Sequence, residues 1–266
     1  MLPQLPHPPR RRYMKQVPWG EFTPAFGLVD YYPFETTGGA NPLRSIAGET
    51  HTAISISGCN RIINDENDGP SGGYAHRMHL FERVGACRAG PYGGMYRGGW
   101  TFPLGRLISS WSVSFWWRMV DQTCHSSGDC AGLFWINAEG FQGKAVIAFG
   151  GSSLRELSLW SPAGGRRPTG YTVEVGTWYH MTLTVEAQRF AFFYLNGKPI
   201  AEDHDRGGAW TLGPNPVIAN YHSPTGNTNN HYARGDLDEF AIWQRAITPG
   251  EVAEVYRATN AGHMPV

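Results

Sequence analysis

The sequence carries no net charge and no long apolar run. Its 266 residues contain 22 Lys and Arg against 22 Asp and Glu. A neutral chain is not expected to present the broad electrostatic surface that binds nucleic acid or an anionic membrane. No apolar stretch approaches the roughly 20 residues of a membrane-spanning helix. We therefore expect neither a nucleic acid nor a membrane among its partners.

Signals for export and glycosylation are also lacking. The N-terminal segment, residues 1 to 12, has no apolar core of the kind that a secretory signal peptide carries. No Asn-x-Ser/Thr sequon occurs, so nothing in the sequence indicates a glycosylated ectodomain. The expectation is a protein that is made without a Sec signal peptide.

Cysteine is scarce, with four residues in the chain. Cys124 and Cys130 could close a short loop as a disulfide or stay as thiols, and the state of Cys59 and Cys87 is equally open. The spacings do not match the paired Cys-x-x-Cys ligands of a zinc ribbon. Cysteine therefore gives no reason to expect a metal.

One polar loop, residues 60 to 73, half resembles a calcium site. Asn64, Glu66 and Asp68 place oxygen ligands at alternate positions before a glycine, as an EF-type loop does. The bidentate Glu that closes such a loop would fall at Ala75, which cannot ligate. We predict a solvated loop, no metal site and no cofactor, with calcium as the minor alternative.

Turn formers and aromatic residues are abundant, with 34 Gly, 19 Pro, 10 Trp, 12 Tyr and 13 Phe. Aromatic residues favour strands, and alternation of apolar and polar residues marks several of them. Residues 112–119 are predicted to form a central strand that turns Val113, Phe115, Trp117 and Met119 to one face and Trp116 to the other. Further strands are predicted at residues 22–34, 52–57, 133–136, 145–149, 154–160, 171–175, 178–185 and 235–243, with a turn at 161–169.

A hairpin is the strongest local signal. Two runs, Phe190 to Leu195 and Lys198 to Ala201, flank Asn196-Gly197. Asn-Gly between two strand-forming runs is typical of a tight turn, because both turn residues need positive φ.

A helix start follows the strand at 235–243. Thr248 is a good N-cap, Pro249 suits the first helical position, and Glu251 closes a capping box. We predict one short helix at about 249–258.

The order of these elements resembles the laminin G-like and concanavalin A-like jelly-roll superfamily. The matching motifs are Trp178-Tyr-His180, Tyr194-Leu-Asn-Gly197, Gly235-Asp-Leu-Asp-Glu239 and Ile247-Thr-Pro-Gly-Glu251, with Ser112-Val-Ser-Phe-Trp116 and Gly27-Leu-Val-Asp-Tyr-Tyr-Pro-Phe34 upstream. The resemblance implies an all-β fold, a two-sheet antiparallel jelly-roll sandwich over residues 23–262. It also implies that the two ends of the domain lie together, with Phe26 and Leu28 packed against Val252 and Val255. Function does not follow from it, because this fold hosts lectins, adhesion modules, glucanases and viral structural proteins.

Residues 1–22 are predicted to form an extended, Pro-rich arm. Five prolines oppose helix and favour polyproline II. The positive charge of the arm is concentrated in Arg10, Arg11, Arg12 and Lys15. The arm is either a disordered tail or a docking arm that becomes ordered on a partner subunit.

The polar loop from Asn220 to Tyr232 is the strongest ligand-binding candidate. It mixes amides, hydroxyls and aromatic rings, which suit hydrogen bonding to a sugar and stacking on it. Long loops without secondary structure are often functional, although such a loop can also be structural. The candidate ligand-binding residues are Tyr221, His222, Asn227, Asn229, Asn230, His231 and Tyr232.

The carboxylate pattern of jelly-roll glucanases is not found. Enzymes of the laminarinase type carry Glu-x-Asp-x-x-Glu or Glu-x-Asp-x-Glu on one strand, which places nucleophile and acid on one face. The nearest cluster, Asp236-Leu-Asp238-Glu239, has the wrong spacing. In the resembling family such acids are structural and bond loop amides. The sequence therefore predicts no catalytic residues and no enzymatic activity.

Three functions from different classes fit these observations. The first is a non-enzymatic structural or interaction protein, a decoration or tail component of a virus or phage particle that binds other protein subunits through the arm. The second is a carbohydrate-binding lectin module with glycans as partners. The third is a glycoside hydrolase of jelly-roll type. The expected location is a virion or another extracellular assembly.

Overall fold

A computed structural model describes the fold of most of the chain. The described residues are 26–34, 45–49, 51–52, 54–55, 61–65, 75–79, 100–119, 132–136, 145–150, 155–161, 165–204, 210–218 and 235–261. The predicted arm, the four cysteines and the predicted ligand loop at 220–232 lie outside these residues.

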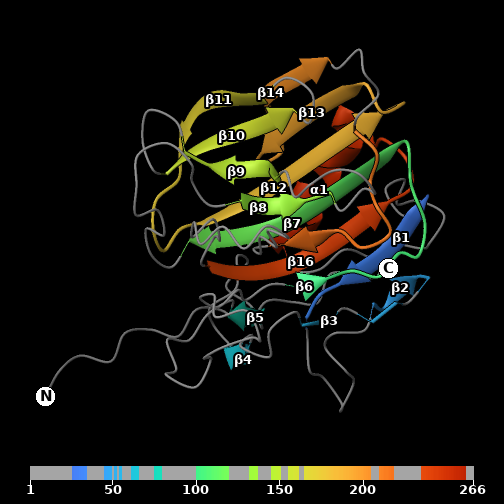
Figure 1. The fold of residues 1–266 in the computed structure, drawn as a ribbon. Coiled ribbons are helices and arrows are strands. Elements are labelled where there is room, and N and C mark those ends of the chain that lie inside the picture. The colour runs from blue at the N-terminus through green and yellow to red at the C-terminus, as the bar shows by residue number, and fades with distance from the viewer. Residues whose placement is uncertain are drawn as a thin grey trace, which may run out of the picture.

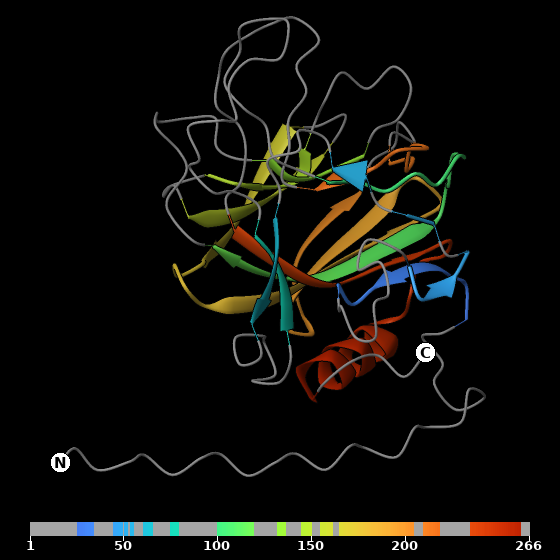
Figure 2. The same ribbon diagram turned by 90° about the horizontal axis from the view of Figure 1, so that it is seen from below.

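Two antiparallel sheets pack face to face, with one helix on the outside of the first sheet (Figures 1 and 2). The predicted all-β, two-sheet sandwich with a C-terminal helix is confirmed. Sheet I runs in the order β14 (Lys198–His204), β13 (Phe190–Leu195), β12 (Trp178–Glu186), β7 (Trp111–Met119), β16 (Gly235–Trp243), β1 (Leu28–Tyr32) and β2 (Ala47–Gly48). Beside β16 it also carries β5 (Ala75–His79), which pairs with β4 (Arg61–Asp65).

Sheet II completes the sandwich. Its order is β11 (Gly165–Thr172), β10 (Glu156–Ser161), β9 (Ala145–Phe149), β8 (Gly132–Trp135), β15 (Val217–Ile218), β6 (Trp100–Thr101) and β3 (Ile54–Ser55). Ring contacts join the two sheets: the centroid of Phe134 in sheet II lies 6.5 Å from that of Phe115 and 6.3 Å from that of Phe240 in sheet I.

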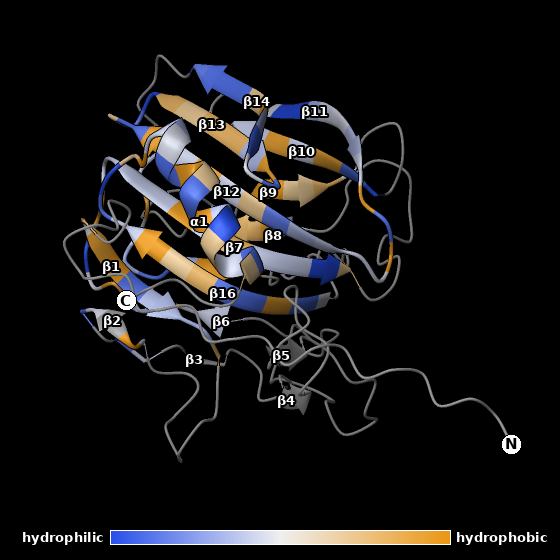
Figure 3. Ribbon diagram, turned by 180° about the vertical axis from the view of Figure 1, so that it is seen from behind, coloured by the Kyte–Doolittle hydropathy of each residue, from blue (hydrophilic) through white to orange (hydrophobic). Residues whose placement is uncertain are grey.

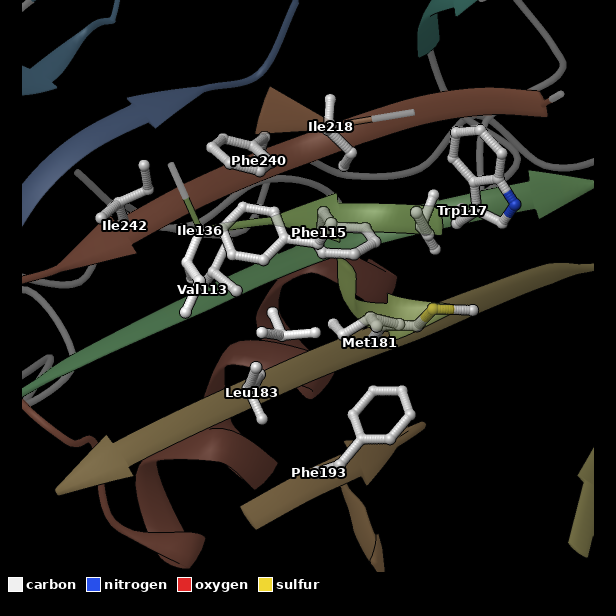
Figure 4. Close-up of a cluster of buried hydrophobic side chains, with 14 of the residues drawn as sticks. Val113, Phe115, Trp117, Ile136, Met181, Leu183, Phe193, Ile218, Phe240 and Ile242 are labelled. Carbon is white, nitrogen blue, oxygen red and sulfur yellow. The ribbon is translucent and has the colours of Figure 1, made fainter. Parts of the chain in front are cut away.

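The central strand β7 shows why the sheets pack in this way. Val113, Phe115, Trp117 and Met119 face the core and are at most 2% exposed, as the alternation predicts. Figure 4 shows Val113 and Phe115 beside Leu183 and Met181, their partners on the neighbouring strand β12. Period-two alternation fills the space between the sheets with apolar side chains. Each fully buried side chain stabilises the fold by roughly 1.5–3 kcal/mol.

The opposite face of sheet I is covered by the helix α1 (Pro249–Ala261) (Figure 3). Val252 and Val255 are buried in a cluster with Tyr31, Trp243 and Ile247. The predicted capping box is present, because Glu251 N donates to Thr248 Oγ1 at 3.3 Å and Thr248 N donates to Glu251 Oε2 at 2.8 Å. The helix extends three residues beyond the predicted end at 258. In the described part of the chain, no helix has both the length and the apolar character that a membrane crossing needs.

The predicted Asn-Gly hairpin is confirmed. Asn196 and Gly197 have φ values of 50° and 75°, and β13 and β14 pair on either side of them. A side chain at Gly197 would begin 3.1 Å from Tyr256 Cδ1. The turn therefore rests directly against α1, where a glycine is needed for both conformation and space.

Two predicted segments are wrong. Residues 165–172, placed largely in a turn, form the strand β11, which tolerates Pro168 because β11 is an edge strand of sheet II. Residues 61–65, placed in a polar loop, form β4. The β-branched pair Ile62-Ile63 favours a strand, but its polar neighbours conceal this signal. The remainder of the predicted calcium loop lies outside the described residues.

The two ends of the described fold lie together, as the family resemblance implied. β1 pairs with β16 and ends at Tyr32, directly before Pro33, which cannot donate a ladder hydrogen bond. Leu28 packs against the cluster that contains Val252 and Val255. Phe26 does not, and the expectation that it would is wrong.

The reason lies in Arg245, which occupies the space beside the start of the domain. Its Nε donates to the Phe26 carbonyl oxygen at 2.7 Å, and its guanidinium carbon lies 5.5 Å from the Phe26 ring centroid. A guanidinium can stack on an aromatic face. This contact leaves the Phe26 ring 77% exposed instead of buried under the helix.

Truncation should locate the beginning of the fold. Deleting residues 1–22 should leave the melting temperature nearly unchanged, whereas deleting through Phe34 should unfold the domain. The longer deletion removes the buried side chains of Val29, Tyr31, Tyr32 and Phe34. Each contributes roughly 1.5–3 kcal/mol against a total stability of about 5–15 kcal/mol. Circular-dichroism melts of both truncated chains test this. A cooperative melt close to that of the full chain after the longer deletion would show that β1 is dispensable.

Candidate functional site

The hairpin of β13 and β14 exposes a group of aromatic side chains on the outside of sheet I. Ala191 and Phe193 belong to the core, so alternation turns Phe190 and Phe192 outward. His204 faces Phe190 across the strand pair, with ring centroids 5.2 Å apart and planes at 77°. The centroid of Phe192 lies 6.4 Å from that of His204. We call Phe190, Phe192 and His204 the aromatic face.

The aromatic face is open at Phe190 and His204, whereas the half-buried ring of Phe192 packs against the cluster under α1. Tyr256 of α1 packs against the turn at Gly197, while Phe190 and His204 pair at the far end of the two strands. Figure 3 shows α1 lying beside the hairpin and leaving the outer part of β14 uncovered. Phe190 is 40% exposed, and the side chain of His204 is 57% exposed.

Polar groups accompany the rings. Glu202 pairs with Phe192 across the strands, and its carboxylate lies 4.0 Å from His204 Nε2. Phe190 is the exposed apolar ring of this face, and the half-buried Phe192 and the exposed His204 extend it. Aromatic faces can stack on the apolar face of a ligand while an imidazole and a carboxylate bond its polar groups.

The aromatic face is not among the sites predicted from the sequence. The hairpin was predicted, and its alternation already placed Phe190 and Phe192 on one side. What the sequence could not give is the reach of α1, which decides how much of that side stays open. The predicted ligand residues at 221–232 and the arm residues at 10–15 lie outside the described residues, so both predictions stand as predictions.

A second surface feature is an open groove of about 560 Å³ at the N-terminal end of α1. Arg245 crosses it and binds both carboxylate oxygens of Glu251, at 2.8 and 2.5 Å. The Arg245 guanidinium holds the pKa of Glu251 below its usual value, and the bonds to Thr248 act in the same direction. The charged groups nearest the helix start are thus already paired, and they fasten α1 to the beginning of the domain. Arg257 and Glu254 also line the groove.

A Ser–His pair lies under α1 but has the wrong surroundings for catalysis. Ser114 Oγ lies 2.8 Å from His180 Nε2, and both residues are buried. The rings of Trp116 and Tyr256 cover the imidazole at 5.2 and 5.5 Å. Within the described residues, His180 Nδ1 has no hydrogen-bond partner, so no carboxylate orients the ring as a triad requires. The pair serves packing.

The acids at the start of β16 join neighbouring strands. Asp236 Oδ2 accepts a hydrogen bond from Arg118 Nε at 2.8 Å, and Glu239 accepts one from the Tyr31 hydroxyl. Asp238 Oδ1 accepts a hydrogen bond from Glu239 N at 2.9 Å. Their role is structural, although two of these partners are side chains of adjacent strands and not the loop amides that the resemblance implied. Among the described residues, no three His, Cys, Asp or Glu side chains form a group suited to a metal ion.

Comparison with known proteins gives one family. The model of the concanavalin A-like lectin/glucanases superfamily, Laminin_G_3, matches residues 98–253. The comparison with curated proteins returned no significant match.

Several solved structures share the fold. The binding domain of Paraclostridial Mosquitocidal Protein 1 has a TM-score of 0.56 and 15% identity, with 89% of this chain and 53% of that chain covered. The binding domain of botulinum neurotoxin serotype D/C has a TM-score of 0.56 and 12% identity, with 88% and 53% covered. Trypanosoma rangeli sialidase in complex with sialic acid has a TM-score of 0.60 and 14% identity, with 90% and 34% covered. This chain spans about half the length of the toxin binding domains and a third of the sialidase.

These structures correct the sequence-based prediction that the chain is not an enzyme. Sialidases, which are glycoside hydrolases, are among the proteins that share the fold. The prediction of no enzymatic activity depended on the absence of a pair of catalytic carboxylates. Sialidases do not follow that pattern, because they use a Tyr nucleophile. The missing carboxylate pattern therefore excludes the laminarinase arrangement and not glycoside hydrolysis as a class. At these identities the likeness shows the fold alone.

Acidification should weaken the fold through His180. Burial lowers the pKa of His180 to about 3, against an ordinary value of 6.5. Between pH 3 and pH 6.5 the unfolded chain binds more protons than the folded chain, because His180 is protonated only when it is unfolded. The stability that the neutral imidazole contributes is therefore complete above about pH 6.5 and is lost as the pH falls toward 3. Each pH unit within this window costs about 1.4 kcal/mol.

Urea unfolding at pH 7, 6 and 5 measures this loss. As the pH is lowered from 7 to 5, the free energy of unfolding should fall in the wild type and should fall less in His180→Gln. His204→Gln removes an exposed imidazole and should keep the wild-type slope. Equal slopes in the wild type and in His180→Gln would contradict the assignment to His180.

Proposed function

The chain belongs to the concanavalin A-like lectin/glucanase superfamily, and from this premise we propose that it is a recognition module that binds carbohydrate through the aromatic face. The observation that carries the proposal is the exposure of Phe190 and His204 at the end of the hairpin, with the half-buried ring of Phe192 beside them. The solved structures that share the fold support it, since they include two toxin binding domains and a sialidase in complex with sialic acid.

The spacing of the rings suits an extended sugar chain. Residues two apart on a strand lie about 7 Å from each other, so a sugar unit stacked on Phe190 would place its neighbour over the part of Phe192 that stays exposed. Glu202 and His204 supply an acceptor and a donor beside the rings. The face is borne by paired strands and not by a loop, so little ordering of the protein is needed on binding.

A glycan array that includes sialylated glycans, followed by titration of the best ligand, tests this proposal. Phe190→Ala should weaken binding by a factor of about 2 to 12, because an aromatic contact contributes about 0.5–1.5 kcal/mol. Phe26→Ala is the matched control, since Phe26 is an exposed ring beside α1 that should not contact the sugar. No saturable glycan binding, or equal losses in the two variants, would overturn the proposal. Release of reducing sugar from the bound glycan would show a hydrolase instead.

A second candidate function is assembly into a particle through the arm. Arg245 bonds the backbone of Phe26 beside α1, so the described fold begins at a fixed place. Arg10, Arg11, Arg12 and Lys15 would supply the positive charge for docking on other protein subunits of a virion or another extracellular assembly. This role is compatible with sugar recognition by the same particle.

Size-exclusion chromatography with candidate assembly partners tests the arm. The full chain should co-elute with its partner, and a chain lacking residues 1–22 should elute alone. Arg10, Arg11 and Arg12 replaced together by Ala should reproduce the loss if charge is the cause. Co-elution of the truncated chain as complete as that of the full chain would contradict docking through the arm.

A further inference from the structure

The segment between β2 and β3 carries a histidine that a buried carboxylate orients. Asp30 of β1 is fully buried, and its Oδ2 lies 2.7 Å from His51 Nδ1. The backbone N of His51 donates to Asp30 Oδ1 at 3.0 Å. These two bonds fix both the tautomer and the direction of the imidazole.

A glycine makes this arrangement possible. Gly48 has a φ of 75°, and a Cβ there would lie 2.0 Å from the Val29 carbonyl oxygen. Only glycine allows β2 to approach β1 so closely. The backbone then closes around Asp30, because Glu49 N donates to Val29 O at 2.6 Å and Ser45 N donates to His51 O at 2.8 Å.

The second ring nitrogen of His51 is left facing a carboxylate at the surface. His51 Nε2 lies 3.7 Å from Glu49 Oε2, with 27% of the His51 side chain and 39% of the Glu49 side chain exposed. Arg106 holds Glu49 in place, since its Nη1 donates to Oε2 at 2.9 Å and its Nη2 donates to Oε1. Arg106 Nη2 also donates to Gln244 Oε1 at 3.2 Å.

We propose that His51 Nε2 and Glu49 Oε2 together bind one divalent transition-metal ion of the zinc type, with water in the remaining positions. Zinc bonds to His nitrogen and to carboxylate oxygen are about 2.0–2.2 Å long, and two of them at a tetrahedral angle place the ligand atoms about 3.4 Å apart. The observed 3.7 Å is reached by a small opening of that angle. The separation of these two atoms is therefore compatible with one shared ion, which would bind beside the hydrogen bond that Glu49 Oε2 accepts from Arg106.

The outer contacts favour a metal over a simple ion pair. A metal-binding imidazole usually donates its other N–H to a carboxylate, and ligating carboxylates are themselves hydrogen-bonded. Here the Asp30 carboxylate bonds His51 Nδ1, and Arg106 donates hydrogen bonds to the Glu49 carboxylate. An imidazole ligand suits zinc, copper or nickel and not calcium or magnesium, which prefer oxygen alone. With two protein ligands the site is open and its affinity modest.

The chain contains a matched comparison. His204 and Glu202 also form a surface His–Glu pair, with Nε2 and Oε2 4.0 Å apart and both side chains more than half exposed. The aromatic ring of Phe190 contacts the His204 imidazole, whereas a buried carboxylate bonds His51. If orientation by Asp30 creates the site, the pair at His51 should bind the metal and the pair at His204 should not.

Titration of the full chain with Zn²⁺ alone, by calorimetry, tests the proposal. His51→Ala and Glu49→Gln should each weaken binding at least tenfold, and His204→Ala should leave it unchanged. Co²⁺ in place of Zn²⁺ reports the ligand type by its absorption, which should show nitrogen and oxygen ligation without a thiolate band. Unchanged binding in His51→Ala, an equal loss in His204→Ala, or a thiolate band that points to the cysteines would each overturn the proposal.

Asp30 acts here as a positioning residue. Asp30→Asn keeps the side-chain size and should weaken Zn²⁺ binding about 10- to 100-fold, the usual effect of losing an outer partner of a ligand. A melt of each variant shows whether it is folded under the conditions of the titration. If Asp30→Asn does not fold, His51→Ala decides alone. A folded Asp30→Asn chain that binds Zn²⁺ as tightly as the wild type would contradict the role given to Asp30.

Discussion

The burial of β7 on both faces is the constraint on which the rest of the structure depends. Residues 111–117 of this strand are all buried. Sheet II covers one side and α1 covers the other. A strand in this position cannot leave any polar group unpaired without cost. Each outward side chain of β7 must therefore find a partner beneath the helix.

The side chains under α1 meet this requirement with short hydroxyl groups. Ser114 Oγ contacts His180 Nε2 and Thr182 Oγ1 at 2.8 and 3.1 Å. Ser112 Oγ donates to the Arg245 carbonyl oxygen at 2.9 Å and accepts from Ile247 N at 3.0 Å. The two hydrogen bonds of Ser112 hold the segment that leads into α1. The polar layer thus sets the place of the helix, and the helix in turn decides which part of sheet I stays open.

Local signals in the sequence were sufficient where one element alone determines the outcome. The strand at 235–243, the Asn196-Gly197 turn and the Thr248 cap depend on neighbouring residues, and all three are present as predicted. β11 escaped prediction because Pro168 is acceptable only at a sheet edge, and no local pattern shows which strand is the edge. Phe26 was misplaced because its partner, Arg245, lies 219 positions away.

Surface sites were harder to predict for the same reason. The aromatic face follows from alternation within β13, but its exposure follows from where α1 ends. The pair of His51 and Glu49 depends on Asp30 and on Arg106, which are 21 and 57 positions from their respective partners. No spacing rule joins such residues. The close approach at Gly48 is the one local sign, since a glycine between an Ala and a Glu at the end of a short strand marks a place where two backbones meet.

The aromatic face and the pair of His51 and Glu49 both lie at the margins of sheet I, and there is a physical reason for this position. β14 and β2 stand at the two ends of the main strand order of sheet I, and an outer strand must avoid pairing with another chain. β14 carries Pro199 and charged residues, while β2 is two residues long. Edges protected in this way hold side chains that neither sheet II nor α1 covers. The centre of the sheet is committed to packing, so recognition is left to its two margins. A ligand on the aromatic face and an ion at His51 would therefore bind at opposite edges without competing.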